Sequence, residues 1–168
     1  MTFNLEKFKN ILHYIIKECG DNPNVGRTVL YKLLYFSDFN FFEIYETKLT
    51  GESYKKLPHG PAPIHFPIAI NELVKEEKIL ETTEPNYFGG LQYNYSSLKD
   101  PVMDLKEKEL EVIDDVIEKL SHMNANQISD YSHGDIPWRA TNDYEIIKYA
   151  YVFYRDPEYT VRDYDESD

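Results

Sequence analysis

A densely apolar segment runs from Gly26 to Tyr45 and reads GRTVLYKLLYFSDFNFFEIY. Its apolar residues recur at helical spacing and would lie on more sides of a helix than a single apolar stripe covers. They are Val29, Leu30, Leu33, Leu34, Phe36, Phe41, Phe42 and Tyr45. A helix that is apolar on most of its sides is usually surrounded by other elements. We therefore expect this helix to lie at the centre of the fold.

Other elements are expected on both sides of this helix. Towards the N-terminus, apolar residues recur at helical spacing from Leu5 to Cys19, and Gly20-Asp21-Asn22-Pro23 ends that helix. Towards the C-terminus, three prolines and two glycines in residues 48–63 exclude a long helix and leave a short extended segment around Tyr54 and Leu57. Three elements follow, namely a helix at about Ile64–Glu77 and two strands at Ile79–Thr83 and Leu91–Tyr95, joined by a turn at Tyr87–Gly90.

The last third of the chain is expected to be helical and acidic. Asp104 followed by Glu107 has the spacing of a capping box and predicts the start of a fourth helix, which runs to Leu120. Asn124 predicts the cap of a short fifth helix that ends at about Ser132, and Tyr149–Arg155 predicts one or two further helical turns. Six acids with one arginine after residue 155 predict a disordered tail.

Together these patterns predict a mainly α fold with a small β-hairpin. The expected architecture is one compact helical bundle over residues 1–156, followed by an acidic tail over 157–168. The order of helix, helix, helix and hairpin is also that of a winged helix. Because the third helix carries only Lys75 and Lys78 beside three glutamates, we expect no binding of nucleic acid by this chain on its own.

Charge is unevenly distributed along the chain. The 30 acidic and 18 basic residues give a net charge of −12, and residues 101–168 hold 17 of the acids but only 7 lysines and arginines. Such a surface repels phosphate and attracts a basic protein. No apolar run approaches the roughly 20 residues that span a bilayer, the N-terminus lacks the pattern of a signal peptide, and Cys19 is the only cysteine. The expected location is the cytoplasm, with no membrane contact.

Three stretches of the chain form an ordered set of motifs. The first is Lys32–Asp38, and the second is Tyr54–Pro61, which ends in His-Gly-Pro. The third consists of Leu120-Ser121, Ser129–His133 and Pro137-Trp138. In this order they resemble the opening helix, the extended segment and the late element of the Panacea family of SocA-like and GepA-like antitoxins. The resemblance covers nearly the whole chain. It implies a small, mostly helical antitoxin that neutralises a co-encoded protein toxin by contact, in some cases a toxic small alarmone synthetase. One branch of the family instead acts as an adaptor that delivers its toxin to a protease.

The residues give little support to catalysis or to metal binding. Cys19 falls on the apolar side of the first helix, where a thiol behaves as a small hydrophobe. No Cys-x-x-Cys or His-Glu-x-x-His pattern occurs, so no metal and no cofactor is expected. His133 beside Asp135 leaves a small enzyme open as an alternative. The favoured interpretation gives both His133 and Trp138 structural roles, with His133 capping the fifth helix or bonding a buried carbonyl.

The remaining residues divide into a structural set and a toxin-binding set. Asp38 is expected to accept a hydrogen bond from the turn formed by His59, Gly60 and Pro61, with the ring nitrogens of His59 holding that turn. The expected toxin-binding acids lie on the fourth helix and are Glu107, Glu111, Asp114, Asp115 and Glu118. The expected aromatic anchors are Phe41, Tyr45, Tyr151 and Tyr154. The oligomeric state stays open, and a homodimer is one of the alternatives.

Overall fold

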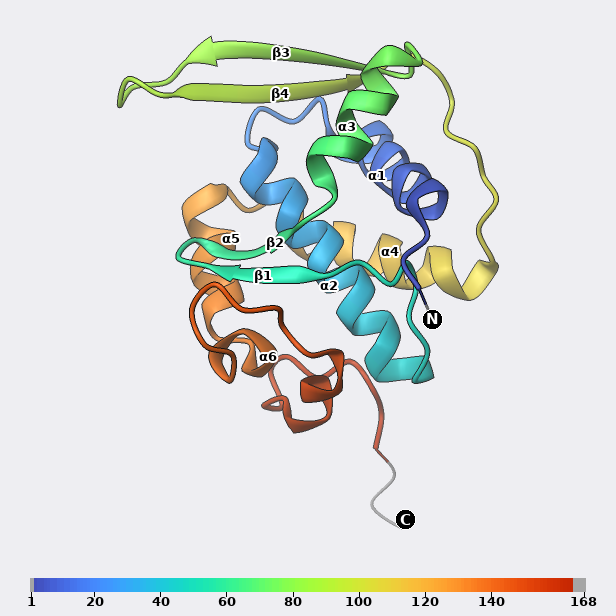
Figure 1. The fold of residues 1–168 in the computed structure, drawn as a ribbon, viewed down its shortest axis with the longest axis vertical. Coiled ribbons are helices and arrows are strands. Elements are labelled where there is room, and N and C mark those ends of the chain that lie inside the picture. The colour runs from blue at the N-terminus through green and yellow to red at the C-terminus, as the bar shows by residue number, and fades with distance from the viewer. Residues whose placement is uncertain (1, 165–168) are drawn as a thin grey trace.

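The computed structural model describes residues 2–164, and helix α2 (Arg27–Tyr45) runs through its middle (Figure 1). Buried side chains occur on successive positions around this helix, with Tyr35 and Phe39 fully enclosed. The helix contacts α1 (Leu5–Cys19), one strand of the hairpin that follows it in the chain, and three helices of the C-terminal third. The prediction of a central second helix is therefore confirmed.

One end of the molecule is built from α1, α3 (Phe66–Lys75) and a long hairpin of β3 (Ile79–Pro85) and β4 (Leu91–Ser97). The two strands are antiparallel, in a register that runs from Ile79 opposite Ser97 to Pro85 opposite Leu91. The hairpin crosses the top of the molecule as an arm (Figure 1). Both strands are two residues longer than the sequence pattern predicts.

A second hairpin, β1 (Tyr54–Leu57) with β2 (Gly60–Pro63), lies between α2 and α3 in the chain. The expected extended segment is present as β1, but its pairing with the proline-containing β2 was not predicted. Pro61 and Pro63 lie opposite residues of β1 whose backbone groups bond outward to residues 144–147. A proline needs no ladder hydrogen bond at such a position, and so both are tolerated.

The C-terminal third contributes α4 (Glu107–Leu120), α5 (Ala125–His133), the short α6 (Ile136–Arg139) and a 3-10 helix, η1 (Tyr149–Tyr154). The predicted start of α4 at Asp104 is wrong. The helix begins three residues later, where the Glu109 carboxylate accepts the backbone N–H of Lys106 at 2.8 Å. The predicted cap of α5 is confirmed, because the Asn124 side chain accepts the backbone N–H of Gln127 at 2.9 Å.

Residues 157–164 pack against the body of the protein, which differs from the expectation of a disordered tail. The backbone N–H of Val161 and the hydroxyls of Thr160 and Tyr164 all donate to the buried carboxylate of Glu43 on α2. A buried carboxylate needs such donors, and the acidic composition of the tail gives no sign of them. The last four residues of the expected tail lie outside the described part of the chain.

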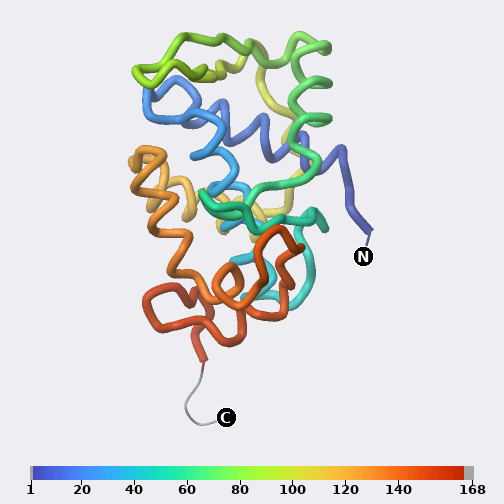
Figure 2. Tube along the Cα trace, turned by 60° about the vertical axis from the view of Figure 1, so that its left-hand side comes forward, coloured from blue at the N-terminus to red at the C-terminus, as the bar shows by residue number. Residues whose placement is uncertain are grey.

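The architecture is mainly α with two small antiparallel hairpins, as expected for the fold class. Figures 1 and 2 both place the β3–β4 arm at one end of the molecule and the segments after residue 136 at the other. Helix α2 connects the two ends. No helix within residues 2–164 is long and apolar enough to cross a membrane.

Candidate partner-binding site

The three motif stretches of the sequence meet in one place in the fold. Gly60 in β2 has a φ angle of +114°, which side-chain-bearing residues rarely adopt. A Cβ atom at this glycine would lie 2.5 Å from Cε of Lys32 on α2 and 2.4 Å from Oγ of Ser132 on α5. Glycine is thus required where these three segments touch.

Asp38 forms a second link between the motifs, with partners that differ from the expected ones. Its carboxylate accepts the backbone N–H of Thr50 at 3.0 Å, the Thr50 hydroxyl at 2.9 Å and the hydroxyl of Tyr54. The prediction that Asp38 accepts a hydrogen bond from the His-Gly-Pro turn is therefore wrong. Burial raises the pKa of Asp38 to about 7, although the hydrogen bonds from Tyr54 and Thr50 oppose this shift.

Trp138 forms the third link. Its indole N–H donates to the carbonyl of Leu57 in β1 at 3.3 Å, and the Lys56 ammonium lies 4.0 Å from the centre of its ring. The His133 ring stacks on the Trp138 ring, with the two ring centres 4.4 Å apart. Trp138 therefore joins α6 to β1, and the structural role expected for it agrees with these contacts.

Two histidines have surroundings that the sequence did not predict. His59 is exposed, and its ring nitrogens make no hydrogen bond to any described residue, so it does not hold its turn as expected. His133 neither caps α5 nor bonds a carbonyl through Nε2, because that buried atom has no hydrogen-bond partner within residues 2–164. Its stacking on Trp138 is the contact that positions the ring.

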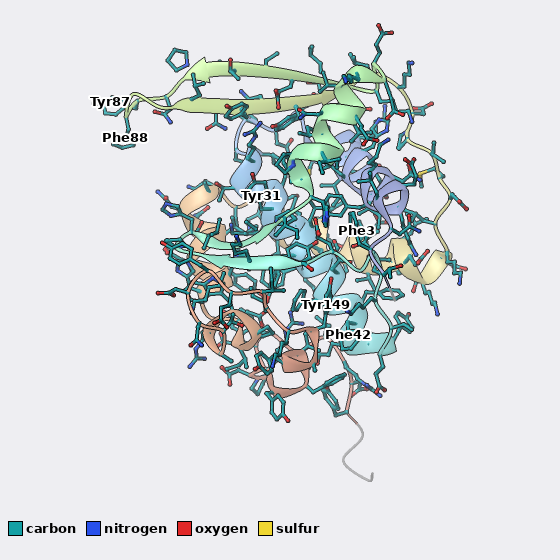
Figure 3. The ribbon with its side chains drawn as sticks, viewed as in Figure 1. Phe3, Tyr31, Phe42, Tyr87, Phe88 and Tyr149 are labelled. Atoms are coloured by element: carbon teal, nitrogen blue, oxygen red, sulfur yellow. The ribbon has the colours of Figure 1, made fainter. Side chains whose placement is uncertain are left out.

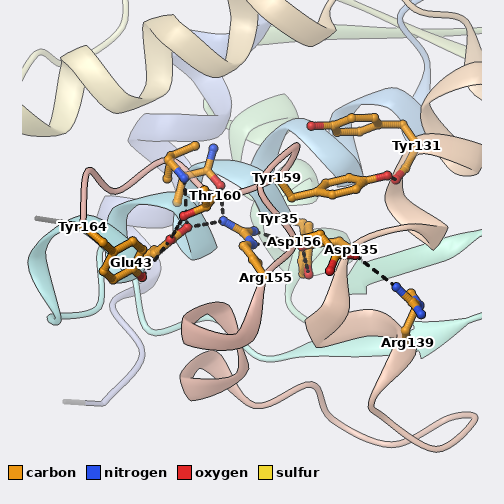
Figure 4. A network of polar contacts seen from close by, with 12 residues as sticks. Tyr35, Glu43, Tyr131, Asp135, Arg139, Arg155, Asp156, Tyr159, Thr160 and Tyr164 are labelled. Carbon is orange, nitrogen blue, oxygen red and sulfur yellow. Dashed lines mark hydrogen bonds and ion pairs between the residues drawn. The ribbon is translucent and has the colours of Figure 1, made fainter. Parts of the chain in front are cut away.

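Arg155 lies at the centre of a buried polar network that the sequence did not reveal (Figure 4). Its guanidinium donates to both carboxylate oxygens of Asp135 at 2.9 Å, and to Asn40 and Glu43 on α2. The Tyr35 hydroxyl donates to the same Asp135 at 2.7 Å. Asn40 and Glu43 interrupt the apolar run from Phe39 to Tyr45, and these interruptions were the available signal for a buried cation.

This network bears on the enzyme alternative. Both oxygens of Asp135 are engaged by Arg155 and Tyr35, so this carboxylate does not orient the ring of His133. The thiol of Cys19 is buried and donates to the carbonyl of Ile15 at 3.2 Å. Burial raises the pKa of Cys19 to about 12, so the thiolate needed for nucleophilic attack is scarce at neutral pH. Neither group has the geometry of a catalytic pair.

Helix α4 presents four carboxylates on one exposed stripe, which we call the acidic stripe: Glu107, Glu111, Asp114 and Glu118. Their spacing of four, three and four residues places them on one side of the helix. The fifth expected acid, Asp115, is half-buried and pairs with Lys119 at 3.0 Å. Asp114 also accepts the hydroxyl of Tyr14. The other three acids of the stripe have no ion-pair partner among the described residues.

A groove of about 550 Å³ adjoins the acidic stripe. It lies between the end of α2, helix α4 and residues 160–163, and Tyr45, Glu111 and Asp115 are part of its lining. Three of the expected toxin-binding residues are thus brought together. Tyr45 is half-buried, with the Lys108 ammonium 4.7 Å from its ring centre.

The other expected aromatic anchors lie elsewhere. Phe41 is only 3% exposed and packs on Tyr45 from inside the core, so the expectation that it contacts a partner is wrong. Tyr151 is half-buried, whereas Tyr154 is largely exposed; both belong to η1 and neither lines the groove. Helical periodicity could not separate Phe41 from Tyr45, because the end of α2 is apolar on several sides.

Comparison with known proteins gives one match. The family model described as antitoxin SocA-like, Panacea domain, matches residues 30–139. Neither the comparison with curated proteins nor that with solved structures gives a match. The matched residues include most of α2, both hairpins, the acidic stripe and the junction formed by Lys32, Gly60 and Ser132. The chain therefore belongs to the Panacea family of SocA-like antitoxins.

Proposed function

We propose that this chain neutralises a co-encoded protein toxin by direct binding, and that the acidic stripe and the adjoining groove form the contact. The observation that carries this proposal is the stripe itself, four carboxylates in line on the exposed side of an ordered helix. Asp38, Gly60 and Trp138, which belong to the family motifs, are occupied in joining the elements of the fold. The surface that recognises a particular toxin is therefore sought on exposed side chains outside that junction.

The stripe is electrostatically unfavourable in the free protein. Like charges four residues apart on a helix destabilise it by about 0.2–0.5 kcal/mol per pair. Glu107 with Glu111, and Asp114 with Glu118, have this spacing. Lysines or arginines of a partner would relieve the repulsion, and the long-range field would accelerate the encounter.

The chemistry of the stripe suggests which part of a toxin it would cover. Toxins that act on nucleotides or RNA hold phosphate groups with lysine and arginine, and carboxylates can compete for those groups. We therefore propose occlusion of a phosphate-binding substrate site, in the cytoplasm where a co-encoded pair is made. A toxic small alarmone synthetase is one partner of this class. Tyr45, Tyr151 and Tyr154 are proposed as apolar contacts.

Binding of DNA by this chain alone is not part of the proposal. On α3 the exposed side chains include Ile68, Val74 and Lys75, a single base among apolar groups. A recognition helix needs several basic side chains that face phosphate. The proposed partner is a protein.

The test is growth rescue by co-expression with the toxin encoded beside this gene. We define a stripe variant, in which three acids are reversed, as Glu107→Lys, Glu111→Lys and Glu118→Lys. A control variant makes the same change in net charge at three other exposed acids: Glu77→Lys, Asp130→Lys and Glu145→Lys. Rescue should be lost with the stripe variant and kept with the control.

Three other results would change the account. If rescue requires an intact cellular protease, the chain is an adaptor that delivers the toxin for degradation. If the neighbouring gene is not toxic and no basic protein co-purifies, the antitoxin proposal fails for this chain. If the substitution His133→Ala abolishes rescue in a folded protein, His133 has a direct role that the geometry does not suggest. The mass of the purified complex would show whether one copy of the chain or two take part.

A further inference from the structure

The tip of the β3–β4 arm displays two aromatic side chains almost completely to solvent. Tyr87 is 96% exposed and Phe88 is 92% exposed, and Figure 3 shows both at the outermost point of the arm. Their rings meet edge to face at 5.5 Å, and Leu91 beside them is also exposed. Adjacent apolar side chains that protrude with polar surroundings commonly mark a site of protein contact.

The backbone of the tip is held in one conformation. The Asn86 side-chain oxygen accepts the N–H of Phe88 at 3.0 Å and that of Gly90 at 2.8 Å, and the Asn86 N–H donates to the Gly90 carbonyl at 2.8 Å. Gly89 supplies the positive φ angle, +84°, that the turn needs. The two rings are thus presented from an ordered loop, which lowers the entropic cost of using them as anchors.

The base of the arm is fixed to the body of the protein. Ile79 and Tyr95 are buried, and the Tyr95 hydroxyl donates to Glu81 at 2.8 Å while accepting from Arg27 at 2.8 Å. Arg27 also lies over the ring of Tyr93, 3.6 Å from its centre. The arm is therefore a rigid projection whose inner half is packed and whose tip is free.

The charge of the arm restricts its partner. Residues 79–98 contain Glu81 and Glu84 and no lysine or arginine. A second copy of this chain, with its net charge of −12, would be repelled, and so would an anionic lipid surface. Glu81 already pairs with Arg27 at 3.3 Å at the base of the arm, which leaves Glu84, near the tip, as the acid that can face a partner. An apolar pocket bordered by lysine or arginine fits both the rings and Glu84.

We propose that Tyr87 and Phe88 insert into an apolar, base-bordered pocket of the toxin, as a second contact distinct from the acidic stripe. This inference rests on the proposed function. Figure 1 shows the tip of the arm and helix α4, which carries the acidic stripe, on different parts of the molecule, so the two contacts hold the toxin at separate points. Aromatic side chains at the centre of an interface commonly supply most of its affinity.

The experiment titrates the purified toxin, the product of the neighbouring gene, with the full chain carrying Tyr87→Ser and Phe88→Ser. A matched control replaces another consecutive pair of exposed apolar residues, by Val102→Ser and Met103→Ser. Because truncation of hot-spot residues commonly costs 2 kcal/mol or more, the tip variant should bind about 30-fold more weakly or worse. The control should bind within about threefold of the wild type, and both variants should melt at the wild-type temperature.

The outcomes separate this inference from the proposed function. If the wild type binds and the stripe variant weakens binding while the tip variant does not, the arm inference is overturned and the proposed function stands. If the wild type does not bind the toxin at all, the proposed function fails and this inference fails with it. If the tip variant changes only self-association in sedimentation, or only attachment to vesicles of phosphatidylcholine, the arm contacts a second copy or a lipid surface and the inference is likewise overturned.

Discussion

The guanidinium of Arg155 donates two parallel hydrogen bonds to the carboxylate of Asp135, from Nε to Oδ1 and from Nη2 to Oδ2, each 2.9 Å long. Both side chains are completely buried. The remaining guanidinium nitrogen reaches Glu43 on α2 at 3.0 Å. This one cation therefore connects the start of α6, the end of η1 and the central helix, and the carboxylates around it are compensated only while it is present.

The substitution Arg155→Met should destabilise the protein strongly. Removing one partner of a buried ion pair leaves carboxylates without compensation and typically costs 3–5 kcal/mol. Denaturant unfolding measures this loss. The matched control is Arg139→Met, whose exposed pairing with Asp156 at 3.4 Å should contribute at most about 1 kcal/mol. Equal losses in the two variants would show that the buried network has no special role.

The burial of Lys32 should make the free energy of unfolding depend on pH. Its side chain is 2% exposed, no carboxylate of the described residues lies within ion-pair distance, and burial lowers its pKa to about 7. In the unfolded chain a lysine has a pKa of about 10.4. Between these two values the unfolded state binds the extra proton, so the contribution of Lys32 to stability rises with pH across this window.

The substitution Lys32→Met should therefore stabilise the protein at pH 6, because the cost of a buried cation disappears while the apolar stem remains. The gain should shrink by about 1.4 kcal/mol for each pH unit above roughly 7. Unfolding free energies at several pH values measure this difference, with the exposed Lys75→Met as the control. A gain that does not change with pH would contradict the lowered pKa.

Trp138→Ala should destabilise the domain by about 2–3 kcal/mol. Full burial of a tryptophan would make the loss about 3–5 kcal/mol, but this side chain is only half-buried. The hydrogen bond to Leu57 and the stacking on His133 are lost together. Thermal melting measures the effect. If melting is unchanged while toxin binding disappears, Trp138 is an interface residue instead.

Some parts of this fold could be predicted from the sequence and others could not, for physical reasons. Helices α1 and α2 have long apolar periodicities, and their bounds agree with the prediction to within a residue. The partner of β1 was missed because Pro61 and Pro63 normally argue against a strand. Their tolerance depends on a backbone contact with residues 144–147, which local pattern cannot show.

The candidate site was predictable in its charge and not in its shape. The acids of α4 follow a local helical rule, so their common exposed stripe could be foreseen from Glu107 to Glu118. The groove beside them forms because residues 160–163 pack against α2 near Glu43. These positions are more than 100 residues apart in the chain.

The protein should not bind duplex DNA on its own at physiological salt. The net charge of −12 opposes approach to phosphate, and the exposed side of α3 holds only Lys75 as a base. Mobility-shift measurements with the promoter fragment of its own operon provide the check. Tight binding that weakens steeply with salt would contradict this expectation, whereas binding seen only with the toxin present would agree with it.

The most direct test of the central claim is the affinity of the purified toxin for the wild type, the stripe variant and the control variant at low and at physiological salt. If the acidic stripe contacts a basic site, the stripe variant should bind about 30-fold more weakly or worse, chiefly through slower association, and lose most of its salt dependence. The control variant, with the same net charge, should stay within about threefold of the wild type. Equal weakening of both variants, or of neither, would contradict the assignment of the toxin contact to α4.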